Sequence, residues 1–140
     1  MPNLKQLADG SMGIEGSDKD VGAFVFVNIP YNTASPLTMS GAVFSRAMQV
    51  QSVTVNPDVP STNAVSVKAW QAPSGTALGS GTALSGNALL NGTAGTNVVA
   101  TLANTPGALQ VAAGSRVGVV ISGALGAAGS GVITIGLTPA

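Results

Sequence analysis

The chain has 140 residues, a length typical of one domain and sufficient to bury a single hydrophobic core. Only 7% of the residues are charged, against about 25% in a typical soluble domain, and the formal net charge is zero. A mean hydropathy of +0.43 argues against intrinsic disorder, and the lack of a basic field argues against nucleic-acid binding.

The residue types needed for most catalytic and metal sites are missing or scarce. The sequence contains neither cysteine nor histidine, which excludes disulfides, thiolate chemistry, serine-histidine-aspartate triads and histidine-based metal sites. Between residues 21 and 140 the only acid is Asp58, so hydrolysis of glycosides by two carboxylates is excluded as well. We therefore predict a protein that is not an enzyme and that binds no metal or cofactor.

No membrane or export segment is predicted. The longest apolar run beyond the start, residues 117–121, is far shorter than the roughly 20 residues of a membrane span. The start, MPNLKQLADG, lacks the apolar stretch of a signal peptide. We expect no membrane association, and we expect the protein to be made in the cytoplasm of the host cell.

The first twenty residues differ from the rest of the chain. They hold six of the ten charged residues, and they carry Gly10, Gly13 and Gly16 at a spacing that disfavours a helix. We predict an extended N-terminal arm over residues 1–20, with a reach of roughly 65–70 Å, joined to a body of residues 21–140. A frayed terminus without a role is the alternative. The candidate partner-binding residues are the charged ones: Lys5, Asp9, Glu15, Asp18, Lys19 and Asp20.

The acids of the arm raise the question of a cation site. The stretch GIEGSDKD places carboxylates at residues 15, 18 and 20, but it lacks the DxDxDG spacing of a calcium loop, and Lys19 interrupts it. The glycine-rich runs GSGTALSG and GAAGSG lack the Gly-Lys-Ser/Thr ending of a phosphate loop. We therefore predict neither a calcium site nor a nucleotide site.

After residue 20 the sequence predicts short strands separated by turns. The aromatic and β-branched run AFVFVNI, residues 23–29, is predicted to be a strand that Pro30 closes. Residues 41–57 begin either as a helix or as two strands, and their second half favours a strand. We expect that strand to end in a turn at Asn56-Pro57, which also holds Asp58.

The strand predicted over residues 64–72 alternates between two faces. Its valines point one way, and Lys68 and Trp70 point the other way, so that Trp70 either covers the second side of the sheet or lies in an interface. We expect the cations of the body, Arg46, Lys68 and Arg116, to be solvated residues at strand edges, where charge discourages aggregation.

Residues 75–95, GTALGSGTALSGNALLNGTAG, nearly repeat themselves. Leu78, Leu84 and Leu90 recur at a spacing of six. A hexapeptide period is typical of a left-handed β-helix, but such a solenoid needs several stacked coils, and the segment provides barely one. We favour a hairpin or a wandering edge segment, in which Ser and Gly form the turns and the leucines contact the core intermittently.

The alternation of apolar and polar residues is clearest towards the C-terminus. Strands are predicted near residues 98–103, 109–111, 117–121 and 132–138, with turns at residues 104–107, 112–115 and 123–131. Together with the earlier elements this gives about eight strands, separated by turns about every ten residues. Such spacing is typical of a β-sandwich or barrel with Greek-key connections.

Four segments together resemble a known family. They are the start MPNLKQLADGSMGIEGSDKD, the aromatic strand that follows it, the hairpin LQVAAGSRVGVVISG and the closing GVITIGLTPA. Over the whole chain the sequence is similar to the cement, or head-decoration, proteins of tailed phages of the Bordetella-phage type. The resemblance implies an all-β protein without enzymatic activity, a jelly-roll β-sandwich of about eight antiparallel strands with an extended N-terminal arm.

The same resemblance implies a structural virion protein on the outer surface of an icosahedral capsid. It would cement neighbouring subunits of a major capsid protein with the HK97-like fold and stabilise the DNA-filled head, as a homodimer in preference to a trimer. The alternative is a carbohydrate-binding β-sandwich module of a phage fibre or surface protein. Such modules usually present exposed aromatic rings, and the aromatic residues of the body are Phe24, Phe26, Tyr31, Phe44 and Trp70.

Overall fold

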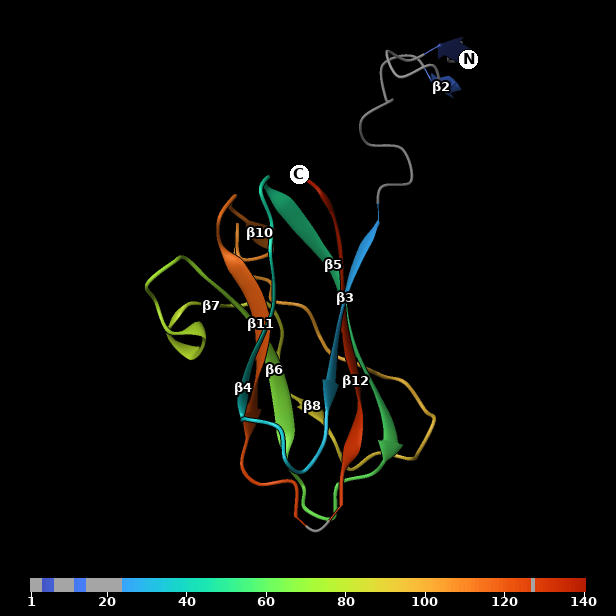
Figure 1. Cartoon of the computed structure of the whole chain (residues 1–140), viewed down its shortest axis with the longest axis vertical. Coiled ribbons are helices and arrows are strands. Elements are labelled where there is room, and N and C mark those ends of the chain that lie inside the picture. The colour runs from blue at the N-terminus through green and yellow to red at the C-terminus, as the bar shows by residue number, and fades with distance from the viewer. Residues whose placement is uncertain (1–3, 7–11, 15–23, 127) are drawn as a thin grey trace.

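The computed structural model shows an all-β protein with two antiparallel sheets that share one hydrophobic core (Figure 1). It describes residues 4–6, 12–14, 24–126 and 128–140. The predicted all-β class is confirmed, and the two sheets are consistent with the predicted sandwich. The jelly-roll connectivity and the number of about eight strands stay predictions.

The first sheet places the first and last long strands of the body side by side. Its strands follow the order β10, β5, β12, β3, and β9 also pairs with β5. Their bounds are β3 (Val25–Tyr31), β5 (Met48–Val59), β9 (Val98–Val99), β10 (Gln110–Val111) and β12 (Ser130–Pro139). Because β12 pairs with β3 on one side and with β5 on the other, β3 is an edge strand.

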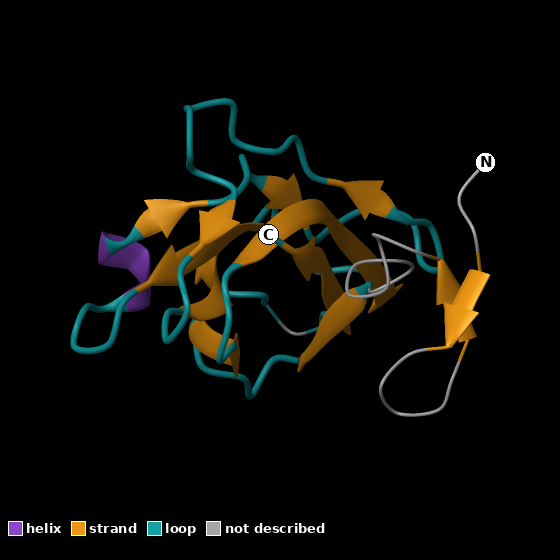
Figure 2. Cartoon of the chain, turned by 90° about the horizontal axis from the view of Figure 1, so that it is seen from above, coloured by secondary structure: helices purple, strands orange, loops and turns teal. Residues whose placement is uncertain are grey.

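The second sheet has the order β4, β11, β6, β7, and β8 also pairs with β6. Its strands are β4 (Thr38–Val43), β6 (Ser66–Ala72), β7 (Thr82–Ala83), β8 (Ala88–Leu89) and β11 (Arg116–Ser122). A short 3-10 helix, η1 (Leu78–Ser80), lies outside the strands and is purple in Figure 2. The long central strand β11 is therefore covered by neighbours on both sides.

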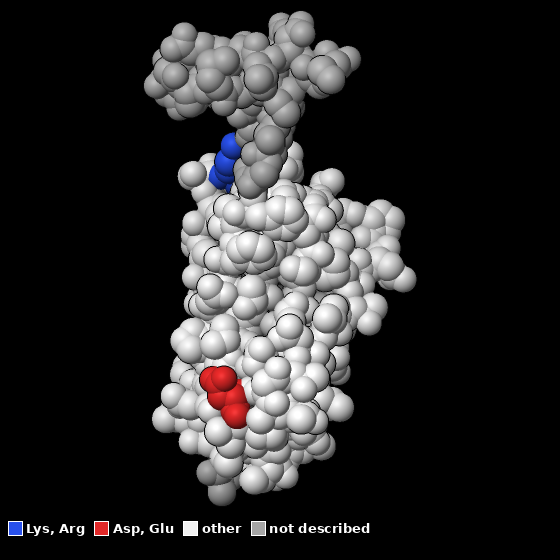
Figure 3. Space-filling view, turned by 90° about the vertical axis from the view of Figure 1, so that its right-hand side faces the viewer, with Lys and Arg blue, Asp and Glu red and all other residues white. Residues whose placement is uncertain are grey.

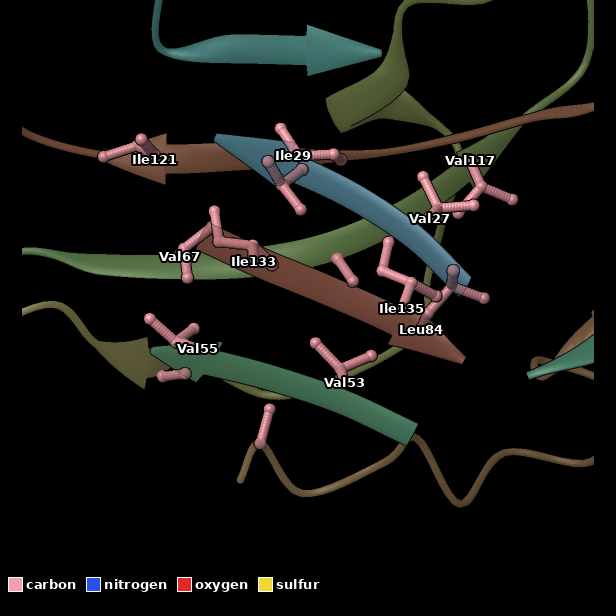
Figure 4. Close-up of a cluster of buried hydrophobic side chains, with 14 of the residues drawn as sticks. Val27, Ile29, Val53, Val55, Val67, Leu84, Val117, Ile121, Ile133 and Ile135 are labelled. Carbon is pink, nitrogen blue, oxygen red and sulfur yellow. The ribbon is translucent and has the colours of Figure 1, made fainter. Parts of the chain in front are cut away.

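The core is built from alternate residues of the long strands, as period-two patterns require. In β11 the side chains of Val117, Val119 and Ile121 are buried, and in β6 those of Val67 and Ala69 are buried, as predicted. Figure 4 shows valine, isoleucine and leucine side chains from both sheets converging in one cluster. The inward face of each predicted strand in this region is therefore assigned correctly.

Two predicted boundaries are wrong, and prolines explain both. Pro30 does not close β3 but lies within it, which an edge strand tolerates because proline has no N–H to donate. Asn56-Pro57 does not form a turn, and neither does Asp58, since β5 continues to Val59. Pro57 lies opposite Gly131, next to a register shift in β12 that accommodates it. The helix considered for residues 42–50 is not formed: the end of β4, a bend and the start of β5 occupy these positions.

The repetitive segment of residues 75–95 is a wandering edge of the second sheet. Strands β7 and β8 both pair antiparallel with the preceding strand β6, and not with each other, so the segment returns along β6 as a hairpin does and is not a coil of a solenoid. Leu78, Leu84 and Leu90 are all buried. Leu84 and Leu90 belong to the core cluster, as predicted, whereas Leu78 is buried outside that cluster, beside Gly118. Many of the small residues between the leucines are exposed, but Ser85 and Ala88 are buried.

Near the N-terminus, β1 (Leu4–Gln6) pairs antiparallel with β2 (Met12–Ile14). This pairing is not predicted from the sequence, because an arm extended throughout would keep the two segments apart. The division into an arm of residues 1–20 and a body of residues 21–140 stays a prediction.

Candidate interaction surface

The six charged residues predicted to bind a partner are only partly within the described chain. Lys5 lies in β1, where its backbone is opposite Gly13. The other five, Asp9, Glu15, Asp18, Lys19 and Asp20, lie outside the described residues. The predicted role of these charges therefore stays a prediction, and the interaction surfaces that the structure describes belong to the body.

One such surface lies at the edge strand β3. Val27, Ile29 and Tyr31 point into the core, so the alternating positions face outward. There Phe24 and Phe26 are 55% and 58% exposed, and their rings stack with centroids 5.8 Å apart and an angle of 17° between the planes. Two stacked aromatic rings in solvent form an apolar platform, and aromatic residues are enriched in protein interfaces.

A glycine on the neighbouring strand leaves space for the ring of Phe26. Gly136 of β12 lies directly opposite Phe26, and Ser52 of β5 lies on the other side of Gly136. Because Gly136 has no side chain, the ring of Phe26 has room to lie over the neighbouring strand. The alternation in AFVFVNI is sufficient to predict the outward phenylalanines. If Val27 and Ile29 share the inner face of the strand, Phe26 must point outward.

Beyond the phenylalanines, the first sheet exposes uncharged polar side chains, a few valines and, near the end of β5, the acid Asp58. Amide and hydroxyl groups bond across neighbouring strands on or beside this face. Thr134 donates to Asn28 Oδ1 at 2.9 Å, Asn56 donates to Asn97 Oδ1 at 2.7 Å, and the side-chain amide of Gln51 donates to Thr138 Oγ1 at 3.0 Å. These bonds hold the side chains in place without charge. Figure 3 shows one side of the molecule, where the coloured charged side chains of the described residues form two small patches.

The outer face of the second sheet carries two of the cations of the body, and neither is at a strand edge as predicted. Lys68 lies on β6 with its ammonium group 5.5 Å from the ring centre of the half-buried Trp70. Arg116 starts β11, between β4 and β6, and it is also half-buried. Arg46 is exposed, in the bend between β4 and β5. The prediction of solvated edge positions is wrong for Lys68 and Arg116, because both belong to inner strands.

Among the described residues, a buried tyrosine is the group whose pKa is clearly shifted. The hydroxyl oxygen of Tyr31 is buried and has no hydrogen-bond partner among the described residues. Burial raises the pKa of Tyr31, and the negative charge of Asp58 raises it further. The tyrosine packs in the core and is not positioned to act on a substrate.

The described part of the chain offers little for chemistry. Within it, no three residues of the types His, Cys, Asp and Glu gather to hold a metal ion. A search of the same residues for a helix that is long and apolar enough to cross a membrane finds none. What the geometry provides is two outer faces, one with the stacked Phe24 and Phe26, the other carrying Lys68, Trp70 and Arg116.

Comparisons with known proteins find no matching family model, and no curated protein or solved structure matches the chain significantly.

Proposed function

We propose that the protein is a structural virion component that binds the outside of an icosahedral phage capsid. In this proposal it cements neighbouring subunits of a major capsid protein with the HK97-like fold and stabilises the DNA-filled head. It works through binding alone, without catalysis, cofactor or metal. The similarity to phage cement proteins in the sequence leads to this proposal, and the surface of the body supports it.

The observation that carries the proposal is the uncharged edge at β3. No residue between positions 21 and 45 is charged, which includes the whole edge strand. Proteins that stay apart usually protect such an edge with charges, because an exposed strand edge pairs readily with other chains. Here the edge instead presents the stacked Phe24 and Phe26. We expect this edge and the platform beside it to bind a partner protein.

The order of the strands supports the jelly-roll part of the proposal. From β3 to β6 the chain alternates between the two sheets, and β12 returns between β3 and β5. A two-sheet body of this kind is a compact clamp with two broad outer faces. A homodimer would carry two copies of each face, so that one dimer could bridge two capsid subunits, and simultaneous binding at both ends would strengthen modest contacts.

The proposal is tested by sedimenting the purified protein with phage shells that lack it, and then by heating the shells. We expect saturable binding and a higher rupture temperature. Replacing both Phe24 and Phe26 by alanine should abolish binding and leave the fold intact, because both side chains are exposed. Leu89→Ala is the matched control, since Leu89 is also exposed but lies on β8 of the other sheet. A folded protein that does not bind shells would overturn the proposal.

A carbohydrate-binding module is the second candidate, and the same aromatic pair favours it. Sugar rings stack on flat aromatic surfaces, and neighbouring amide and hydroxyl groups, such as those of Asn28 and Thr134, could bond sugar hydroxyls. A glycan array separates the two candidates. Specific glycan binding that Phe26→Ala removes, together with no binding to shells, would favour the module.

A further inference from the structure

The position of Arg116 is unusual for a cation in a sheet. Its neighbour Val117 points into the core, so the side chain of Arg116 lies on the outer face of the second sheet. A turn at residues 74–77 lies over it there, and Arg116 donates a hydrogen bond from Nη2 to the carbonyl oxygen of Thr76. Leu78, which follows the turn, packs over Gly118. The guanidinium group is therefore held between the sheet and the turn.

This guanidinium group has more donors than acceptors. It carries five N–H groups, and its Nε is buried without a hydrogen-bond partner in the described part of the chain. A buried donor without a partner has lost its hydrogen bonds to water, and the cost in free energy is larger when the group is charged. The only acid among the described residues is Asp58, which lies on β5 in the other sheet. The arginine is thus partly desolvated without a counter-charge from the body.

An open hollow lies next to the side chain of Arg116, which forms part of its lining. Its volume is about 480 Å³, and besides Arg116 it is lined by Val43, Gly114 and residues 74–77. Ser74 and Thr76 contribute hydroxyl groups to this lining. The hollow therefore combines one positive charge with small polar groups and with enough space for a side chain or a small anion.

We propose that this hollow is a binding site for a carboxylate group, with Arg116 as the residue that binds it. A guanidinium group has planar donors that match the two oxygens of a carboxylate, and its single charge balances a single negative charge. A phosphate would bring more negative charge than the lining can balance, because Arg116 is the only cation in it. The site does not depend on the proposed capsid function.

The distribution of charge indicates where such a carboxylate can come from. Residues 1–20 contain four acids and two lysines, a net charge of −2, whereas residues 21–140 contain Arg46, Lys68, Arg116 and one acid, a net charge of +2. The zero charge of the whole chain hides two parts of opposite sign, which attract each other. The carboxylate is either one of these four acids, in the same chain or in a second copy, or it belongs to another protein.

The test uses the full chain and nuclear magnetic resonance of the arginine Nε–H groups. The chain has two arginines, so two signals are expected, and Arg46→Gln identifies which one belongs to Arg116. Sodium acetate is titrated against sodium chloride at equal ionic strength. We expect the Arg116 signal to shift with acetate and to saturate, and the exposed Arg46 to show only a small drift in both salts.

A second readout is the melting temperature, which a ligand raises when it binds only the folded state. Acetate should raise it relative to chloride for the wild type and for Arg46→Gln, but not for Arg116→Gln. If Arg116→Gln does not fold, the resonance titration of the wild type still decides. The proposal is overturned if the Arg116 signal responds equally to acetate and chloride both in the wild type and in a variant whose four N-terminal acids are neutralised, or if inorganic phosphate binds it more tightly than acetate.

A variant with Asp9→Asn, Glu15→Gln, Asp18→Asn and Asp20→Asn distinguishes the sources of the carboxylate. If an acid of the chain occupies the hollow, the Arg116 signal of this variant moves before any acetate is added, and acetate then binds more tightly than to the wild type. If the size of this shift in the Arg116 signal depends on protein concentration, the acid comes from a second copy of the chain. If the signal stays in place and acetate still saturates it, the carboxylate comes from another protein.

Discussion

Gly136 lies directly opposite Phe26, and a Cβ atom on Gly136 would stand 3.2 Å from Phe26 Cε1 and 2.6 Å from Ser52 Oγ. We therefore expect Gly136→Ala to lower the free energy of unfolding by about 1–3 kcal/mol. Gly79→Ala is the control, because its Cβ would meet Val120 at an ordinary 3.6 Å and should change stability by less than about 0.5 kcal/mol. Urea denaturation measures both, and equal stabilities would show that Phe26 does not rest on the glycine.

A charged substitution tests which side chains of β11 point into the core. Val119 is fully buried, so Val119→Asp places an unpaired carboxylate in the core and should unfold the body or cost more than about 4 kcal/mol. Val99→Asp introduces the same charge at a residue that is 73% exposed, and it should be tolerated. Circular dichroism during heating compares the two variants. A normal melting curve for Val119→Asp would refute the assigned facing.

The role of the regularly spaced leucines is tested at two neighbouring positions. Leu84 is fully buried, and Leu84→Ala should cost about 2–5 kcal/mol through lost burial and a residual cavity. Leu89→Ala removes the same atoms from a side chain that is 51% exposed and should cost under about 1 kcal/mol. Denaturant midpoints give both values. Similar losses would mean that the segment does not anchor through every sixth residue.

The raised pKa of Tyr31 predicts how the stability of the fold changes at alkaline pH. Because burial, and then Asp58, raise its pKa in the folded state, the neutral phenol is favoured by folding. The stabilisation that results from the raised pKa is fully present below the unfolded-state pKa of about 10. It is lost as the pH rises through the higher pKa of the folded state. Tyr31→Phe should therefore lose less stability between about pH 9 and about pH 11 than the wild type.

Ultraviolet absorbance can follow this titration directly, because the chain has a single tyrosine. At neutral pH, Tyr31→Phe should be as stable as the wild type or more stable by up to about 1 kcal/mol, since it removes a buried hydroxyl group without a partner. If the free energy of unfolding falls equally with rising alkaline pH in the two proteins, Tyr31 does not control the loss of stability.

Deleting residues 2–20 tests the predicted arm. We expect the remaining body to fold with a similar melting temperature, because every residue of the described core lies after position 26. Binding to shells should fall by about tenfold or more if the arm provides a second contact. Sedimentation with shells measures this loss, and circular dichroism controls for folding. Unchanged binding would remove the arm from the mechanism.

The parts of the fold that follow from local patterns could be predicted. Alternating valines in residues 117–121 fix both the strand and its inner face, and the leucines at a spacing of six identify buried anchors. Pro57 misled the prediction, because a proline next to an asparagine is typical of a turn. Only the glycine opposite it, Gly131, and the register shift in the neighbouring strand make its place in β5 possible.

The surfaces were harder to predict, because they depend on residues far apart in the chain. The role of Arg116 depends on the turn at residues 74–77, about forty positions earlier, which no local pattern relates to it. The exposed phenylalanines follow from alternation within β3, but the room for Phe26 depends on Gly136 in the last strand. The predicted partner-binding charges stay a prediction, since five of the six lie outside the described residues.

The position of β12 determines the order in which the first sheet can form. This strand begins about seventy residues after β5 ends, yet it lies between β3 and β5 and pairs with both. Without β12, β3 and β5 lack the partner that joins them, so the first sheet cannot close until β12 is in place. The rate of folding is therefore expected to depend on contacts between segments far apart in the chain, which makes folding slow.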